Sequence, residues 1–234
     1  MITIEIAGIP IGIDNRYDFR RRMLPYITEK APVFTVSVTD EELEAERGSE
    51  SHPSEYLEFI CAYRKIAEQL PAYDAFVFHG AAVALDGQAY LFTAPSGTGK
   101  TTHVNLWLKR FHGSWVLNGD KPVIRRIDGR FCVCGTPWQG KERLGFPMIR
   151  PVAGVCLLHR GVENSIKPVT GQELAVFAMH QVYLPKDPER LTEFLSLLDE
   201  FFRTVPTYSM RCNMDVSAAE LSYKTMRRGA VAAD

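Results

Sequence analysis

The sequence predicts an α/β protein with a mixed sheet, in which antiparallel hairpins surround a phosphate-binding loop. An apolar segment, Gln88–Thr93, runs into a loop rich in Gly, Ser and Thr, and a helix-forming segment follows that loop. Asp-Gly pairs at 86–87 and 128–129 each join two strand-like segments, which is typical of β-hairpins. An ordinary doubly wound nucleotide-binding sheet would instead surround its loop with βαβ crossovers.

Composition restricts the class of protein further. Of the 234 residues, 46% are hydrophobic and 24% are charged, as in a soluble globular enzyme, and the formal net charge of -1 argues against a nucleic-acid partner. No apolar segment is long enough to span a bilayer, so we expect no membrane partner. The N-terminus alternates like a strand and does not resemble a signal peptide, and the five cysteines fit reduced thiols. We therefore expect a cytoplasmic protein.

The first third of the chain predicts short strands and two helical segments. Up to about Thr39 we expect strands, with a helix around Tyr17–Tyr26. The acidic segment Asp40–Ser54 has no hydrophobic stripe, which predicts a loop or a frayed helix with a solvated face. Helical periodicity returns over Tyr56–Leu70 and ends at Pro71. We expect residues 1–70 to pack on a nucleotide-binding core at 75–135.

The middle of the chain alternates strands with the predicted loop and its helix. Ala75–Leu85 is strand-like and precedes the first Asp-Gly turn. After Gln88–Thr93 and the loop, the pattern predicts a helix at Thr102–Phe111, a strand at Ser114–Leu117 and a hairpin of Val123–Ile127 with Arg130–Cys134. Cys132 and Cys134 share one strand face, and core packing is favoured over half of a metal site.

The last third predicts further elements and no separate domain. There is no internal repeat and no long linker, so one domain over residues 1–234 is the simplest interpretation. The expected elements are a strand at Val152–His159, helices near Gly171–Tyr183 and at Pro188–Thr204, a strand at Thr207–Cys212 and a helix at Val216–Arg228.

The segment Leu91–Thr102, LFTAPSGTGKTT, is typical of a phosphate-binding loop (P-loop, Walker A). Glycines allow successive N–H groups to face a polyphosphate, and the dipole of the following helix also favours an anion. A loop lysine can reach the β- and γ-phosphates, and the next threonine can hold Mg²⁺. The pattern usually begins with glycine, and here Ala94 requires a backbone with negative φ. The predicted ligands of ATP or another NTP are Pro95, Ser96, Gly97, Thr98, Gly99, Lys100, Thr101 and Thr102.

Asp120 is the predicted second ligand of the magnesium ion, beside Thr101. It follows the strand after the loop helix, where a carboxylate would face the phosphates. The alternative is a turn aspartate that stabilises residues 119–122 through local hydrogen bonds.

Other candidate catalytic residues lie outside the loop. The segment 136–145 contains Lys141 and Arg143 between glycines, which could close over the γ-phosphate or bind an anionic acceptor, or could form a solvated loop anchored by Trp138. His79 is either a buried strand histidine or an active-site group. His103 could touch the nucleotide, but simple exposure is the more common outcome.

Residues 75–135 resemble the superfamily of HPr kinase/phosphorylase and phosphoenolpyruvate carboxykinase. The sequence SGTGKTT is similar to the carboxykinase loop, and Phe78-His79-Gly80-Ala81 resembles the histidine-containing strand of HPr kinases. The resemblance implies an HPr kinase C-terminal-domain or carboxykinase-like fold and a metal-binding role for Asp120. In those families an aspartate that serves as base in HPr kinase precedes the metal ligand, and here that position is Gly119.

The resemblance and the motifs together predict a short, Mg²⁺-dependent, HPr-kinase-like phosphotransferase. Lys100, Asp120, Lys141, Arg143 and His79 would be its catalytic residues, and ATP its phosphoryl donor. Asp120 could also act as the base, His79 could replace it, or positioning and charge neutralisation could suffice. The acceptor would be a hydroxyl of a peptide, a small protein or a metabolite. A nucleotide-binding sensor or carrier and an NTP hydrolase or phosphorylase remain alternatives, and homo-oligomer formation is left open.

Overall fold

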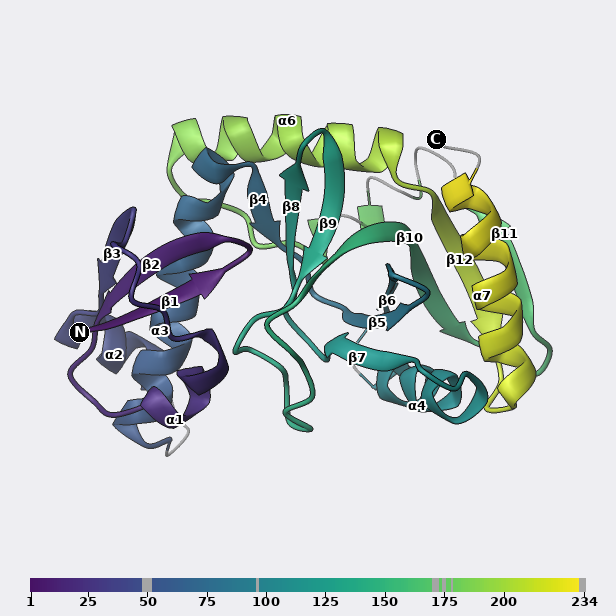
Figure 1. The fold of residues 1–234 in the computed structure, drawn as a ribbon, viewed down its shortest axis with the longest axis horizontal. Helices are drawn as coiled ribbons and strands as arrows, with labels where there is room; N and C mark the ends of the chain where they lie inside the picture. Colours follow the sequence, from purple (N-terminus) through teal and green to yellow (C-terminus); the bar gives the residue numbers. More distant parts are fainter. Residues whose placement is uncertain (48–51, 96, 170–172, 174–175, 178, 232–234) are drawn as a thin grey trace.

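The computed structural model describes residues 1–47, 52–95, 97–169, 173, 176–177 and 179–231, and the side chains up to residue 227. Within these residues, nine strands form one mixed sheet and a smaller sheet lies at the N-terminus (Figure 1). No described helix combines the length and apolar composition needed to cross a membrane.

The N-terminal part consists of a small sheet and the helices packed on it. Strand β1 alternates buried isoleucines with half-buried residues, which fits one face on a core. The first part of the acidic segment, Asp40–Arg47, forms a regular helix, because the backbone N–H of Thr39 donates to the Glu42 carboxylate and the N–H of Glu42 donates to the Thr39 hydroxyl. The elements are β1 (Ile2–Ile6), β2 (Ile9–Asp14), α1 (Arg20–Met23), the 3₁₀ helix Leu24–Tyr26, β3 (Phe34–Ser37), α2 (Asp40–Arg47), α3 (Ser54–Gln69) and the 3₁₀ helix Leu70–Tyr73.

The central sheet contains both predicted hairpins. Its strands follow the order β4-β8-β9-β10-β6-β5-β7, with β12 beside β10 and β11 beside β12. β5 pairs antiparallel with β6 and β8 with β9, and the residues of both Asp-Gly turns have positive φ, so these predictions are confirmed. The strands are β4 (Ala75–Val77), β5 (Ala81–Leu85), β6 (Gln88–Thr93), β7 (Trp115–Asn118), β8 (Val123–Ile127), β9 (Arg130–Cys134), β10 (Ile149–Arg160), β11 (Ser165–Pro168) and β12 (Thr207–Cys212).

One strand prediction is wrong. Ala75–Leu85 is not a continuous strand, because β4 ends at Val77 and pairs with β8, whereas β5 begins at Ala81 and pairs with β6 and β7. Between them the N–H of His79 donates to the Gln181 carbonyl. A side chain at Gly80 would meet the Phe92 carbonyl oxygen at 2.8 Å, so glycine permits this close crossing of two backbones.

The long strand β10 joins two halves of the sheet. Its first residues pair antiparallel with β9, and its later residues pair parallel with β6 and β12. Figure 1 shows β10 curving across the molecule between these partners. The carboxyl ends of β6, β10 and β12 therefore point to the same edge of the sheet, which is where α/β proteins bind ligands.

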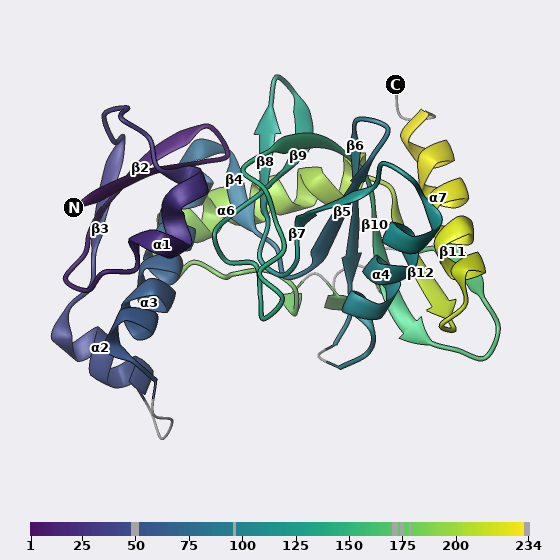
Figure 2. The same ribbon diagram turned by 60° about the horizontal axis from the view of Figure 1, so that its bottom comes forward.

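Three helices cover the two faces of the central sheet. α6 (Pro188–Thr204) packs on one face, while α4 (Lys100–Arg110) and α7 (Val216–Val231) pack on the other (Figure 2). The predicted helix at Gly171–Tyr183 lies partly outside the described residues, of which Glu173, Val176, Phe177 and Met179 are helical.

A third core joins the small sheet to the central one. Isoleucines of β1 and β2 belong to the same apolar cluster as Cys132, Cys134 and Trp138. The two cysteines are buried in this core, and no three His, Cys, Asp or Glu side chains in the described part of the chain are grouped to hold a metal ion.

Phe201→Ala tests the packing of α6. Phe201 is fully buried, with its ring 5.1 Å from that of Phe131 and 5.5 Å from that of Phe76. We expect the free energy of unfolding to fall by about 3–5 kcal/mol, measured by urea denaturation. The matched control is Leu195→Ala, because Leu195 lies on the same helix with 46% of its surface exposed. Equal losses for the two variants would contradict the assigned face.

Candidate functional site

The predicted phosphate loop lies between β6 and α4, at the carboxyl end of the parallel strands. Gly97 has a φ of +75° and Gly99 a φ of +123°, and glycine adopts such angles without strain. Ala94 is not among the residues with positive φ, as expected from its methyl group. The N–H of Thr98 donates to the Pro95 carbonyl at 3.2 Å. Ser96 lies outside the described residues.

Lys100 is the first residue of α4, and its ammonium group turns back toward the strand. Its Nζ donates to the Ala94 carbonyl at 2.8 Å, so the charge lies at the point where β6 enters the loop. Burial lowers the pKa of Lys100, and the negative charge of Asp120 opposes this shift. Thr101 and Thr102 are exposed on the first helical turn. The N–H groups of that turn have no partner within the helix, and Gly99 before it offers no capping side chain.

A buried asparagine fixes the position of Asp120 after β7. The Asn118 side-chain oxygen accepts hydrogen bonds from the backbone N–H groups of Asp120 at 2.9 Å and Lys121 at 2.8 Å. Its amide nitrogen donates to the carbonyl and the hydroxyl of Thr136. The predicted local turn bonds therefore exist, but Asn118 makes them, and the Asp120 carboxylate is left for other contacts.

The Asp120 carboxylate contacts His79, which lies 41 positions earlier in the sequence. His79 Nε2 is 3.3 Å from Asp120 Oδ1, and the N–H of Gly80 donates to the Asp120 carbonyl at 2.9 Å. Burial acts to raise the pKa of Asp120, but the His79 hydrogen bond and the charges of Lys121 and Lys100 outweigh it and lower that pKa. Asp120 is therefore ionised at neutral pH.

Lys121 is a charged neighbour that sequence reasoning missed. Burial lowers its pKa, the nearby Lys100 lowers it further and Asp120 raises it. The only signal in the sequence was that Lys121 directly follows Asp120, the predicted metal ligand. That Lys121 lies near Lys100 is seen only in the fold.

Segment 136–145 packs against the end of β7 and fills the space around Gly119. A side chain at Gly119 would meet the Gln139 carbonyl oxygen at 2.8 Å and the Leu144 carbonyl oxygen at 3.3 Å. The N–H of Gly119 donates to Leu144, and the N–H of Lys121 donates to the Trp138 carbonyl. The backbone of this segment thus occupies the space that a side chain at position 119 would need.

The two cations of this segment, Lys141 and Arg143, are exposed. The backbone just before Lys141 lies close to Asp120. A Cβ atom built on Gly140 would lie 3.1 Å from the Asp120 Cβ. Trp138 is the predicted packing anchor, with 5% of its surface exposed and its indole N–H donating to the Phe59 carbonyl.

His103 is neither exposed nor placed at the loop, contrary to both expectations. It is 1% exposed between α4 and α7, and its Nε2 lies 3.1 Å from the Ser222 hydroxyl. His103 lies three residues after the first residue of α4, on the side of the helix that faces the sheet. Its ring packs edge-to-face against that of Phe92.

Further residues around the loop carried no sequence motif. Arg160, at the end of β10, donates to the Gly97 carbonyl at 2.6 Å. The Thr93 hydroxyl contacts the Gln181 side chain at 2.6 Å and the His79 carbonyl at 2.9 Å. These contacts join segments far apart in the sequence, so only the tertiary fold brings them to the loop.

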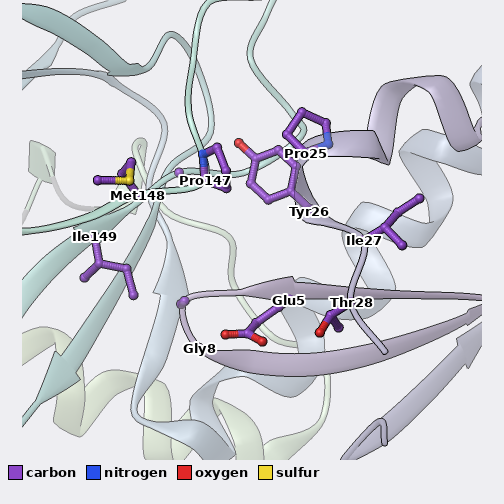
Figure 3. A pocket seen from close by; sticks show the side chains of 11 residues that line it. Glu5, Gly8, Pro25, Tyr26, Ile27, Thr28, Pro147, Met148 and Ile149 are labelled. Carbon is purple, nitrogen blue, oxygen red and sulfur yellow. The ribbon is translucent and has the colours of Figure 1, made fainter. Parts of the chain in front are cut away.

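Two cavities differ in their relation to this cluster. One of about 870 Å³ is lined by His79, Ala94 and Pro95, by side chains of β10 and β12, and by Val169, Glu173, Val176, Phe177, His180 and Gln181. A smaller one of about 250 Å³ lies between the β1–β2 turn, Tyr26 and Pro147 (Figure 3). Only the larger cavity includes predicted site residues.

The pH dependence of stability tests the burial of His103. Burial lowers its pKa to about 4, from 6.5 in the unfolded chain, so only the unfolded state gains a proton between these values. Its contribution to stability is complete above about pH 6.5 and is lost as the pH falls toward 4, by up to about 3 kcal/mol. We expect His103→Gln to flatten this loss in urea denaturation series from pH 7 to 4.5. His112→Gln, at an exposed histidine, should keep the slope of the unmodified protein.

Comparisons with known proteins give distant similarity in structure and none in sequence. No protein-family model matches the sequence, and no curated protein matches it. Among solved structures, the chain is similar to the Hpr(Ser) kinase/phosphatase from Coxiella burnetii, with a TM-score of 0.38 and 8% sequence identity. The matched region covers 67% of this chain and 96% of that one. At this level the similarity does not assign the chain to a family.

Proposed function

We propose that this protein is a Mg²⁺- and NTP-dependent phosphotransferase that moves the γ-phosphoryl group of ATP or another NTP to a hydroxyl. The observation that supports this most is the cluster of Lys100, Asp120 and His79 at the end of the strand that enters a glycine loop. A phosphoryl-transfer site needs N–H donors and a lysine for the phosphates, together with a carboxylate for the metal. The N–H donors and the lysine would come from the predicted loop, and the carboxylate from Asp120.

The loop would hold the polyphosphate through its backbone. The positive φ angles of Gly97 and Gly99 and the uncapped first turn of α4 leave N–H groups to face an anion. Lys100 would exchange its bond to the Ala94 carbonyl for the β- and γ-phosphate oxygens. Arg160, which already binds the Gly97 carbonyl, adds positive charge beside the loop.

The residues present fit a magnesium ion. Asp120 is ionised because its pKa is lowered, and Thr101 offers an exposed hydroxyl on the first turn of α4, so both are suited to a hard cation that also binds phosphate. When bound, the ion would neutralise charge on the phosphates. In this proposal Thr101 and Asp120 hold the metal.

His79 and Asp120 together would receive the proton of the attacking hydroxyl. An additional carboxylate at position 119 is excluded because the backbone of segment 136–145 fills that space. His79, in the connection between β4 and β5, instead approaches the carboxylate, with its Nε2 3.3 Å from Asp120 Oδ1. Lys141 and Arg143 would act on the γ-phosphate or on an anionic acceptor only if their segment moved toward the site.

Lys100→Ala tests the nucleotide site. Removal of one charged donor to a phosphate should weaken the affinity for an ATP analogue with Mg²⁺ about 10- to 100-fold, measured by calorimetry. Lys109→Ala is the matched control, because Lys109 is an exposed lysine of the same helix. Unchanged affinity in Lys100→Ala would contradict the proposed phosphate loop.

Asp120→Asn separates catalysis from binding. We expect turnover of labelled ATP with Mg²⁺ to fall about 100-fold or more, because loss of the metal-binding charge weakens the transition state more than the ground state. Asp128→Asn, in the exposed hairpin turn, should retain the rate of the unmodified protein. A protein that binds nucleotide but never turns it over would instead be a sensor or carrier module. Full activity of Asp120→Asn would contradict the metal assignment.

A further inference from the structure

The larger cavity lies on the face of the sheet opposite α4 and α7. Leu157 of β10 pairs with Thr93 of β6 on one side and with Ser209 of β12 on the other. Its chain neighbours Cys156 and Leu158 point into the core under α4 and α7. Because side chains alternate along a strand, Leu157 and its partner Ser209 point to the opposite face, and both line the cavity. The floor of the cavity is therefore the sheet itself, at the carboxyl ends of its parallel strands.

The opposite wall comes from residues that follow β11. Val176 and Phe177 line the cavity, and the ring of Phe177 is anchored 6.3 Å from that of Phe78. Gln181, also in the lining, is bound to Thr93 through its side chain and to His79 through its carbonyl. These bonds hold the end of the wall against the strand that enters the phosphate loop.

One end of the cavity coincides with the reactive end of the proposed phosphate site. His79, which contacts Asp120, lines the cavity, and so do Ala94 and Pro95 at the start of the loop. Lys100 binds the Ala94 carbonyl, and such a lysine belongs to the β- and γ-phosphates. In this proposal the cavity adjoins the γ-phosphate. The nucleoside, attached to the α-phosphate, would lie farther from the cavity.

The chemistry of the lining restricts the ligand. None of the described residues that line the cavity is a lysine or an arginine, and the lining includes the Glu173 carboxylate, so the described lining disfavours a phosphate or a carboxylate. The lining also contains apolar side chains such as Leu157, Val176 and Phe177, together with histidines that can hydrogen-bond a hydroxyl. A volume of about 870 Å³ matches the size of small-molecule sites.

We propose that this cavity is the acceptor site and takes a small, uncharged organic molecule with an apolar body and a hydroxyl directed at His79. The inference rests on the proposed phosphotransferase function. The hydroxyl oxygen would bond to the γ-phosphorus while the bond from that phosphorus to the β–γ bridging oxygen breaks. The nucleoside diphosphate leaves with the electron pair, and the hydroxyl proton passes to the His79–Asp120 pair.

The test uses 2-phenylethanol as the probe and ethylbenzene as its hydroxyl-free control, with binding measured by ligand-observed NMR. We expect 2-phenylethanol to bind at millimolar concentration and about tenfold more tightly than ethylbenzene, because one hydrogen bond is gained. His79→Phe should remove this preference. Two results would overturn the proposal. One is the absence of 2-phenylethanol binding at 20 mM, which is roughly the weak limit of specific affinity. The other is equal affinity for the two probes.

Two substitutions fill the cavity from different places. Leu157→Trp enters it from the sheet floor, and His159→Trp from an exposed position of the same strand, so a folding defect in one leaves the other informative. Both should weaken 2-phenylethanol binding tenfold or more and leave the affinity for a Mg²⁺–ATP analogue within about twofold, because neither Leu157 nor His159 belongs to the loop, to α4 or to the Asp120 cluster. Leu195→Trp, on the exposed side of α6, is the control and should change neither affinity.

The nucleotide measurement distinguishes a failure of the acceptor assignment from a failure of the phosphotransferase function. If the tryptophan variants weakened the ATP analogue as strongly as the probe, the cavity would hold the nucleoside and the acceptor assignment would be wrong. If the unmodified protein bound the probe but no nucleotide, the phosphotransferase function itself would fail, and the acceptor role with it.

Discussion

The site depends on one buried side chain, Asn118, which joins the end of β7 to the segment that begins at Thr136. Its oxygen accepts two backbone N–H groups and its amide donates twice to Thr136, so the turn that carries Asp120 is fixed from inside the protein. A buried amide left without these partners would cost about 1–3 kcal/mol, which makes the arrangement specific. Because Asn118 satisfies the turn, the Asp120 carboxylate is left to meet His79.

The same arrangement leaves little room for a side chain at position 119. The hydrogen bonds of Asn118 and Gly119 bring segment 136–145 so close that a side chain at position 119 would collide with two carbonyl oxygens. His79 approaches from the connection between β4 and β5 and contacts the remaining carboxylate. Burial acts to raise the pKa of Asp120, but the His79 hydrogen bond and the charges of Lys121 and Lys100 lower it on balance. Burial lowers the pKa of both lysines, and the charge of Asp120 opposes that shift.

The cavity and the charged cluster share the carboxyl ends of the parallel strands. In α/β sheets this edge collects loops from several strands, so polar groups of distant sequence segments meet there. β10 matters most for this geometry, because it continues from the antiparallel half of the sheet into the parallel half. It supplies both the cavity floor at Leu157 and, at Arg160, a donor to the Gly97 carbonyl in the loop between β6 and α4.

Local patterns in the sequence determined the loop between β6 and α4, both Asp-Gly hairpins, α6 and the mixed sheet, because each depends on neighbouring residues and their periodicity. Tertiary structure alone decided the break between β4 and β5, the burial of His103 and the approach of His79 to Asp120. These depend on contacts between residues tens of positions apart, which no local pattern records. Local sequence therefore set the position of the loop, and the fold decided which side chains surround it.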